Sequence, residues 1–138
     1  VNSPLPYPNA RCCIFKLNDK ADSLWLQYYG KTESNIFGSA NSADGGYYIF
    51  GSCGNVEHSA VQQAYLAKIN KNGNLIWEQN FDGWRNSNIL GITEMPDGTI
   101  VCAGSTDNAG GHKNGTNSFL VFLNSNGSFK NHSPTNDY

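Results

Sequence analysis

The sequence is short of charge, and this limits the partners it can bind. Charged residues make up 14% of the 138 residues, well below the roughly 25% of an average soluble domain. The 9 Lys and Arg residues form no cluster, and 11 Asp and Glu residues bring the formal net charge to −2. Nucleic acids and anionic membrane surfaces require a basic patch, so neither is expected as a partner.

Long hydrophobic runs are also missing. The longest apolar stretches, such as residues 99–103, have the length of a strand, whereas a membrane-spanning helix needs about 20 apolar residues. Membrane insertion is therefore not expected. Residues 1–11 contain Pro4, Pro6 and Pro8 and no apolar signal-peptide core. We expect them to form an extended N-terminal segment, which fits a mature protein or an excised segment equally well.

The sequence contains no C-x-x-C pair, and its three histidines are scattered. A metal site is therefore not expected, and no sequence feature points to a cofactor. Cys12, Cys13, Cys53 and Cys102 are an even number, which is compatible with two disulfides in an oxidising compartment. Alternatively, Cys102 serves as a small buried hydrophobic residue inside an apolar strand.

Asn, Ser and 15 Gly take the place of the missing charge, and 12% of the residues are aromatic. Such a surface is polar, rich in turn formers and poor in helix formers. The aromatic content is too high for a disordered chain. The composition predicts an all-β extracellular domain, either secreted or on the cell surface.

An internal repeat predicts the architecture. Residues 65–77 resemble residues 13–25, and a third copy covers residues 119–129. Between them, residues 44–52 resemble residues 97–105. Trp25 and Trp77 lie 52 positions apart, and Asp44 and Asp97 lie 53 apart. The two spacings agree, so the repeat has a period of about 52 residues.

Each period contains four short apolar runs bounded by turn residues, which is typical of strands. The Asp-Gly and Asn-Gly pairs at residues 44–45, 97–98, 72–73 and 126–127 are strong hairpin signals. The expected strands are residues 24–29, 36–41, 47–52 and 64–70 in one unit, and residues 75–81, 89–95, 99–105 and 119–124 in the next. Four antiparallel strands of this length form a β-propeller blade.

At this level the chain resembles bacterial secreted and surface β-propeller repeat proteins. The resemblance rests on residues 68–77 and 44–51, and it extends over most of residues 12–129. It implies an all-β fold of four-stranded antiparallel blades, about two and a half of them, with repeat units at about 24–70 and 75–124. Residues 130–138 are expected to form a polar tail. The resemblance says little about function, because such blades serve many roles.

A closed propeller needs at least about four blades, so this chain cannot close a ring alone. The expected strand at residues 13–18 lacks the rest of its blade, and nothing except Lys16 protects its edge. The sequence therefore predicts self-association or additional blades supplied in trans. Cys12 or Cys13 would then be placed to reach a cysteine of a neighbouring chain.

Catalytic constellations are not apparent. Asp44 and Asp97 occupy equivalent turn positions, and spacing gives Glu94 and Asp82 no carboxylate partner. No G-x-S-x-G motif marks a nucleophilic serine. We therefore expect no enzymatic activity and no catalytic residues.

Ligand binding is instead expected in the polar loops. Trp84 and Arg85 lie in one such loop and His112 in another, and these three are the candidate contacts for a ligand such as a glycan. Three sequons give possible glycosylation sites at Asn114, Asn126 and Asn131. The sequence thus favours a non-catalytic binding or assembly module. The alternatives are a carbohydrate-binding lectin that oligomerises to complete a propeller and a segment of a larger propeller hydrolase.

Overall fold

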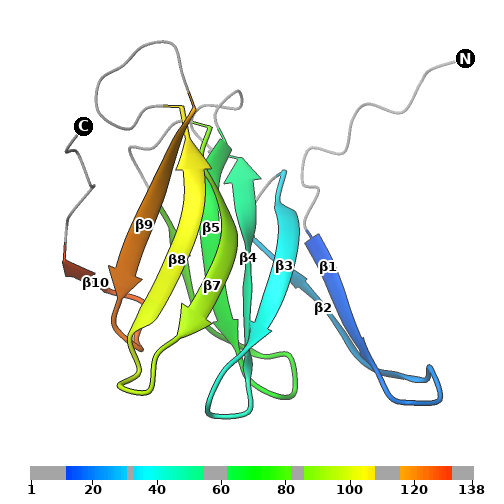
Figure 1. Cartoon of the computed structure of the whole chain (residues 1–138). Coiled ribbons are helices and arrows are strands. Elements are labelled where there is room, and N and C mark those ends of the chain that lie inside the picture. The colour runs from blue at the N-terminus through cyan, green and yellow to red at the C-terminus, as the bar shows by residue number, and fades with distance from the viewer. Residues whose placement is uncertain (1–11, 31–32, 55–61, 82–85, 108–115, 132–138) are drawn as a thin grey trace, which may run out of the picture.

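The computed structural model describes residues 12–30, 33–54, 62–81, 86–107 and 116–131 (Figure 1). Within these ranges the chain forms strands and turns and no helix, which confirms the expected all-β class. The strands are β1 (Cys12–Leu17), β2 (Ser23–Tyr29), β3 (Asn35–Asn41), β4 (Tyr47–Gly54), β5 (Gln62–Ile69), β6 (Leu75–Asn80), β7 (Asn88–Glu94), β8 (Ile100–Thr106), β9 (Asn117–Leu123) and β10 (Phe129–Asn131).

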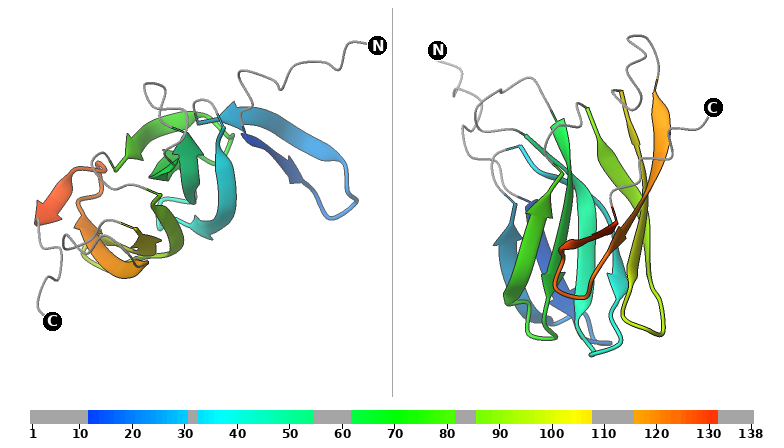
Figure 2. Two further views of the ribbon diagram at one scale, coloured as in Figure 1. Left: turned by 90° about the horizontal axis from the view of Figure 1, so that it is seen from above. Right: turned by 90° about the vertical axis from the view of Figure 1, so that its left-hand side faces the viewer.

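The strands form three antiparallel sheets of the blade type. The hairpin β1–β2 stands alone, the central sheet has the order β3-β4-β5-β6, and the C-terminal sheet has the order β10-β9-β8-β7. The view from above in Figure 2 shows the three sheets as successive layers, with the central sheet in the middle. Two four-stranded sheets and one hairpin agree with the expected two and a half blades.

The sheets group the strands differently from the expected repeat units. Strand β6 was expected to begin the unit 75–124, but it pairs with β5 and completes the central sheet. Likewise β2 pairs only with β1 among the described strands. The reason is local, because the tight turn at residues 70–74 folds β6 directly back onto β5. Residues 130–131 belong to β10 instead of the expected tail.

The Asp-Gly turns form as expected. Asp44 Oδ1 accepts a hydrogen bond from the Gly46 N–H at 2.9 Å, and Gly45 has a φ of +82°. Glycine adopts this left-handed conformation without the steric cost that a side chain would add. The corresponding turn joins β7 to β8, with Asp97 accepting from the Thr99 N–H. Asp44 and Asp97 are therefore turn residues, as the repeat indicated.

Two hydrophobic clusters hold the layers together, one on each face of the central sheet. The cluster shared with the hairpin contains Tyr29, Ile49, Cys53, Tyr65, Ala67 and Ile69. The cluster shared with the C-terminal sheet contains Tyr48, Phe50, Ala64, Leu66, Phe81, Ile89, Ile100, Cys102, Phe119, Val121 and Leu123. Strands β4 and β5 are consequently buried along almost their whole length.

Candidate functional site

The loop residues expected to bind a ligand lie outside the described residues. This applies to Trp84, Arg85 and His112, and also to the sequon at Asn114. The asparagines of the other two sequons lie within the described residues. Asn126 is exposed in the turn between β9 and β10, where its Oδ1 accepts from the Ser128 N–H at 3.0 Å. Asn131 is the last residue of β10.

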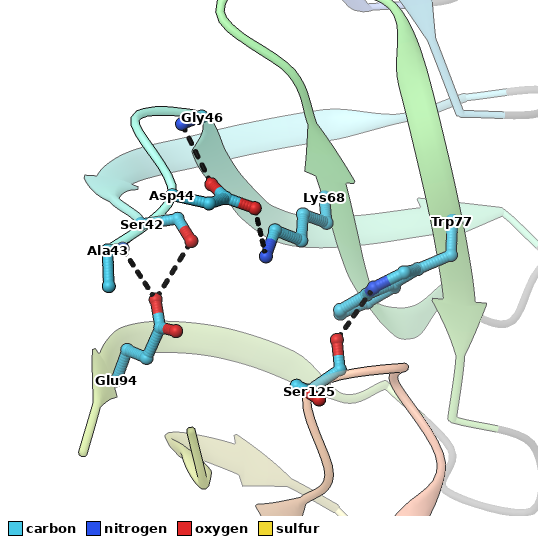
Figure 3. A network of polar contacts seen from close by, with 8 residues as sticks. All are labelled: Ser42, Ala43, Asp44, Gly46, Lys68, Trp77, Glu94 and Ser125. Atoms are coloured by element: carbon cyan, nitrogen blue, oxygen red, sulfur yellow. Dashed lines mark hydrogen bonds and ion pairs between the residues drawn. The ribbon is translucent and has the colours of Figure 1, made fainter. Parts of the chain in front are cut away.

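A network of polar contacts instead joins the central and C-terminal sheets at the end where the tight turns gather (Figure 3). Glu94, at the end of β7, reaches across to the turn between β3 and β4. Its Oε2 accepts a hydrogen bond from Ser42 Oγ at 2.9 Å and another from the Ala43 N–H at 3.0 Å. The carboxylate thereby ties the turn of one sheet to the first strand of the next.

The neighbouring ion pair lies within the central sheet. Lys68 Nζ lies 2.7 Å from Asp44 Oδ2, and the Lys68 side chain is only 9% exposed. The same Nζ lies 5.3 Å from the centroid of the Tyr48 ring, close enough for a cation–π contact. The buried ammonium group therefore has both an anionic partner and an aromatic face.

The pKa values agree with a structural role for this network. The hydrogen bond from Lys68, followed by that from the Gly46 N–H, lowers the pKa of Asp44 to about 2. Burial opposes the charge on Glu94, but hydrogen bonds from Ala43 and Ser42 outweigh it and lower its pKa. Burial also opposes the charge on Lys68, yet its hydrogen bond to Asp44 prevails and raises the pKa. All three groups are thus held in their charged forms, which suits ion pairing better than proton transfer.

Tryptophans make a second type of contact between layers. Trp25 Nε1 donates to the Lys71 carbonyl oxygen at 3.2 Å, and Trp77 Nε1 donates to the Ser125 carbonyl oxygen at the same distance. In both cases the acceptor lies in the tight turn that joins the third and fourth strands of the next layer. These turns are β5–β6 for Trp25 and β9–β10 for Trp77. Each tryptophan is half-buried and packs against the edge of a hydrophobic cluster.

Each tryptophan also lies directly against a glycine of that turn. A Cβ atom placed on Gly73 would come within 2.8 Å of the Trp25 ring, and one on Gly127 within 2.9 Å of the Trp77 ring. Only glycine leaves room for the indole there. We call this pair of contacts, the hydrogen bond and the packing on glycine, the Trp–Gly latch.

The two outer layers present apolar side chains on the faces that point away from the central sheet. The first, which we call the hairpin face, consists of Cys13, Phe15 and Leu17 of β1 and Leu24, Leu26 and Tyr28 of β2. Phe15 is 58% exposed and pairs with Leu26, which is 49% exposed. Large apolar side chains grouped on one exposed sheet face are typical of an interaction surface.

The second surface, which we call the C-terminal face, lies on β8 and β9. It consists of Val101, Ala103, Leu120 and Phe122, with Met95 beside them at the start of the β7–β8 turn. Leu120 and Phe122 are 46% and 43% exposed. An open hollow of about 320 Å³ is lined by Met95, Val101 and Phe122 together with residues of the turn.

None of the four cysteines takes part in a disulfide in the structure, so neither of the two possible disulfides is present. Cys53 and Cys102 are buried, Cys12 is half-buried and Cys13 is exposed on the hairpin face. Burial raises the pKa of Cys102 to about 12, consistent with its alternative role as a small core residue. In the described ranges, no group of three or more His, Cys, Asp or Glu side chains could hold a metal ion.

Sequence reasoning did not anticipate the role of Glu94. The signal was available, since Glu94 and Ser42 are separated by 52 positions, one period of the repeat. A residue separated by one period lies on the adjacent layer when blades stack. The hairpin face also has a sequence signal, because four apolar residues occupy the successive positions 12–15 and so fall on both faces of the strand.

Comparison with protein-family models and with curated proteins finds no match for this chain. No helix in the described part of the chain is long and apolar enough to cross a membrane. The geometry of the sheets and of their outer faces is therefore the basis for the function proposed below.

Proposed function

We propose that this chain is a non-catalytic extracellular assembly module, built from β-propeller-type blades, that binds further sheets through its two outer faces. The single observation that carries the proposal is the exposure of the hairpin face and the C-terminal face. Phe15, Leu26 and Tyr28 on one and Leu120 and Phe122 on the other are all between 43% and 61% exposed. Covering such a face removes apolar area from water, which favours association.

The inner contacts support this role. Glu94 of the C-terminal sheet accepts hydrogen bonds from Ser42 and Ala43 of the central sheet, and the Asp44–Lys68 ion pair beside them lies within the central sheet. The Glu94 contacts contribute to holding these two layers in register. The surface poor in charge and rich in Asn, Ser and Gly, together with the resemblance to bacterial secreted and surface β-propeller proteins, supports the extracellular setting.

The test is the mass of the 138-residue chain in solution, measured by light scattering over a series of concentrations. We expect an average mass above 15.1 kDa that rises with concentration. The double variant Phe15→Glu/Phe122→Glu places a charge on each outer face and should remain monomeric.

A matched control is Phe37→Glu. Phe37 is 54% exposed, like the other two phenylalanines, but lies on the edge strand β3, outside both faces. This variant should associate like the wild type. A wild-type chain that stays monomeric up to its solubility limit would contradict the proposed function.

A further inference from the structure

The layers inside the chain always meet through the same two types of face. In the central sheet, the Ile49–Ala67 pair faces the hairpin, and the corresponding Cys102–Val121 pair of the C-terminal sheet faces the central sheet. In both sheets, therefore, the face that carries this pair packs against the layer that precedes it in the chain. The opposite face of the central sheet, with the Phe50–Leu66 pair, receives the layer that follows.

Strand register shows which type of face each end of the stack leaves exposed. The Ala103–Leu120 pair of the C-terminal face corresponds to Phe50–Leu66. The C-terminal face is therefore of the type that receives a following layer. On the hairpin, the Phe15–Leu26 pair corresponds to the Ala67–Glu78 pair of the central sheet. Ala67 faces the layer that precedes the central sheet. The hairpin face is of the type that packs on a preceding layer, so the two exposed faces are complementary in kind.

The Trp–Gly latch is changed on both of these faces together. The pairs Lys16–Trp25, Lys68–Trp77 and Phe122–Asn131 occupy corresponding positions, so Asn131 stands where the other layers have tryptophan. The corresponding turn residues are Ala21, Gly73 and Gly127, all with positive φ. In the hairpin, Ala21 carries a Cβ atom that would collide with the indole of a preceding layer. The C-terminal sheet has Asn131 at the tryptophan position, so it would bring no indole against Ala21.

The Glu94 contact shows a second matched change. The Glu94 carboxylate accepts two hydrogen bonds from the β3–β4 turn, one from Ser42 Oγ and one from the Ala43 N–H. The corresponding turn of the C-terminal sheet has Met95 and Pro96, which offer no hydroxyl and no backbone N–H there. The hairpin, as described, has only the third and fourth strand positions and so presents no strand in the place of β7. The C-terminal face thus lacks the donors that such a carboxylate would need, and the described part of the hairpin presents no such carboxylate.

We propose that the partner of these faces is a second copy of this chain, docked head to tail, with the hairpin face of one copy on the C-terminal face of the next. This inference rests on the proposed function and adds the partner, the two surfaces and their direction. The contact is apolar on both sides, Phe15, Leu26 and Tyr28 meeting Val101, Leu120 and Phe122. Each added copy leaves one face of each kind free, so association continues until a ring closes or a filament grows.

The test uses complementation between two single variants, Phe15→Glu and Phe122→Glu. The first blocks only the hairpin face and the second only the C-terminal face. Each variant alone should lose association by about 30-fold or more, the effect of losing a central aromatic anchor. An equimolar mixture should form a 1:1 dimer and nothing larger, because one intact hairpin face and one intact C-terminal face remain available. Circular dichroism of each variant confirms the fold, since both side chains are exposed in the single chain.

Other results would overturn the arrangement. If Phe122→Glu alone still dimerises, two hairpin faces meet each other, and if Phe15→Glu alone still dimerises, two C-terminal faces do. If both variants are monomeric and the mixture is too, the two faces do not bind each other. In these three outcomes the wild type still associates, so the head-to-tail arrangement fails while the proposed function stands. A monomeric wild type refutes both.

Discussion

Replacing Gly127 by alanine tests whether the Trp–Gly latch holds the C-terminal sheet to the central sheet. Gly127 has a φ of +84°, and a Cβ atom there would lie 2.9 Å from Trp77 Cε3 and 3.0 Å from Trp77 Cδ2. Two costs therefore add. A left-handed conformation at an alanine costs about 1 kcal/mol, and displacing the indole costs a further ~1–3 kcal/mol, as is typical of overpacking.

Gly45 provides the matched control for the conformational cost. It also occupies a tight turn, with a φ of +82°, but a Cβ atom there would have no neighbour within 4 Å. Gly45→Ala should therefore cost about 1 kcal/mol, whereas Gly127→Ala should cost about 2–4 kcal/mol. The difference between the two variants isolates the contact with Trp77.

The assay is chemical denaturation, with the midpoint and the slope of the transition recorded for each variant. The experiment is repeated in a Trp77→Ala background, where the indole is absent and Gly127→Ala should cost no more than Gly45→Ala. The reasoning is refuted if Gly127→Ala and Gly45→Ala are equally destabilising in the wild-type background. The latch would then be a contact without energetic consequence.

Three further predictions concern the polar network and the thiols. Glu94→Ala should lower the free energy of unfolding by about 1–2 kcal/mol, since it leaves donors of the β3–β4 turn without their charged acceptor; Glu94→Gln, which keeps an acceptor oxygen, should lose less, and equal losses in denaturation midpoints would argue against the contact. The pKa of Asp44 in the fold is about 2, below its ordinary value of 3.8. The charge on Asp44 therefore stabilises the fold at pH values above 3.8, and this contribution is lost as the pH falls through 2. Asp44→Asn should therefore lower the urea midpoint at neutral pH, and this difference should shrink as the pH falls to 2 and below. A pH-independent difference would contradict this. Alkylation of the monomeric Phe15→Glu/Phe122→Glu variant, read by mass spectrometry, should modify Cys13, which is exposed in the single chain, and spare the buried Cys102. Rapid labelling of Cys102 would show that its strand is not packed as described.

Strand positions were predictable from sequence because apolar alternation and turn chemistry are local. The expected strand 47–52 is found at Tyr47–Gly54, and the expected strand 24–29 at Ser23–Tyr29. Grouping into sheets was harder, because a repeat read from sequence has no natural starting point. A unit beginning at β2 and one beginning at β3 have the same period, and only the pairing of β5 with β6 distinguishes them.

The contacts between layers could be predicted only in part. Trp25 and Trp77 stood out because they recur with the period, but their partners at Gly73 and Gly127 depend on how adjacent sheets are offset in space. Glu94 resembled any exposed carboxylate beside a turn, since its link to Ser42 is not visible until two layers are stacked. The loop residues chosen as ligand contacts lie outside the described residues and remain predictions.

The position of the central sheet between two layers implies a gradient of local stability along the chain. The amides of β4 and β5 lie in strands flanked by neighbours on both edges and covered on both faces. They should exchange with deuterium only when the whole unit opens. The hairpin β1–β2 is covered on one face alone, so its amides should exchange through a smaller opening that leaves the rest folded. Such an opening would separate Ile14 and Trp25 from the central sheet, so the least protected element is also the one that carries the hairpin face.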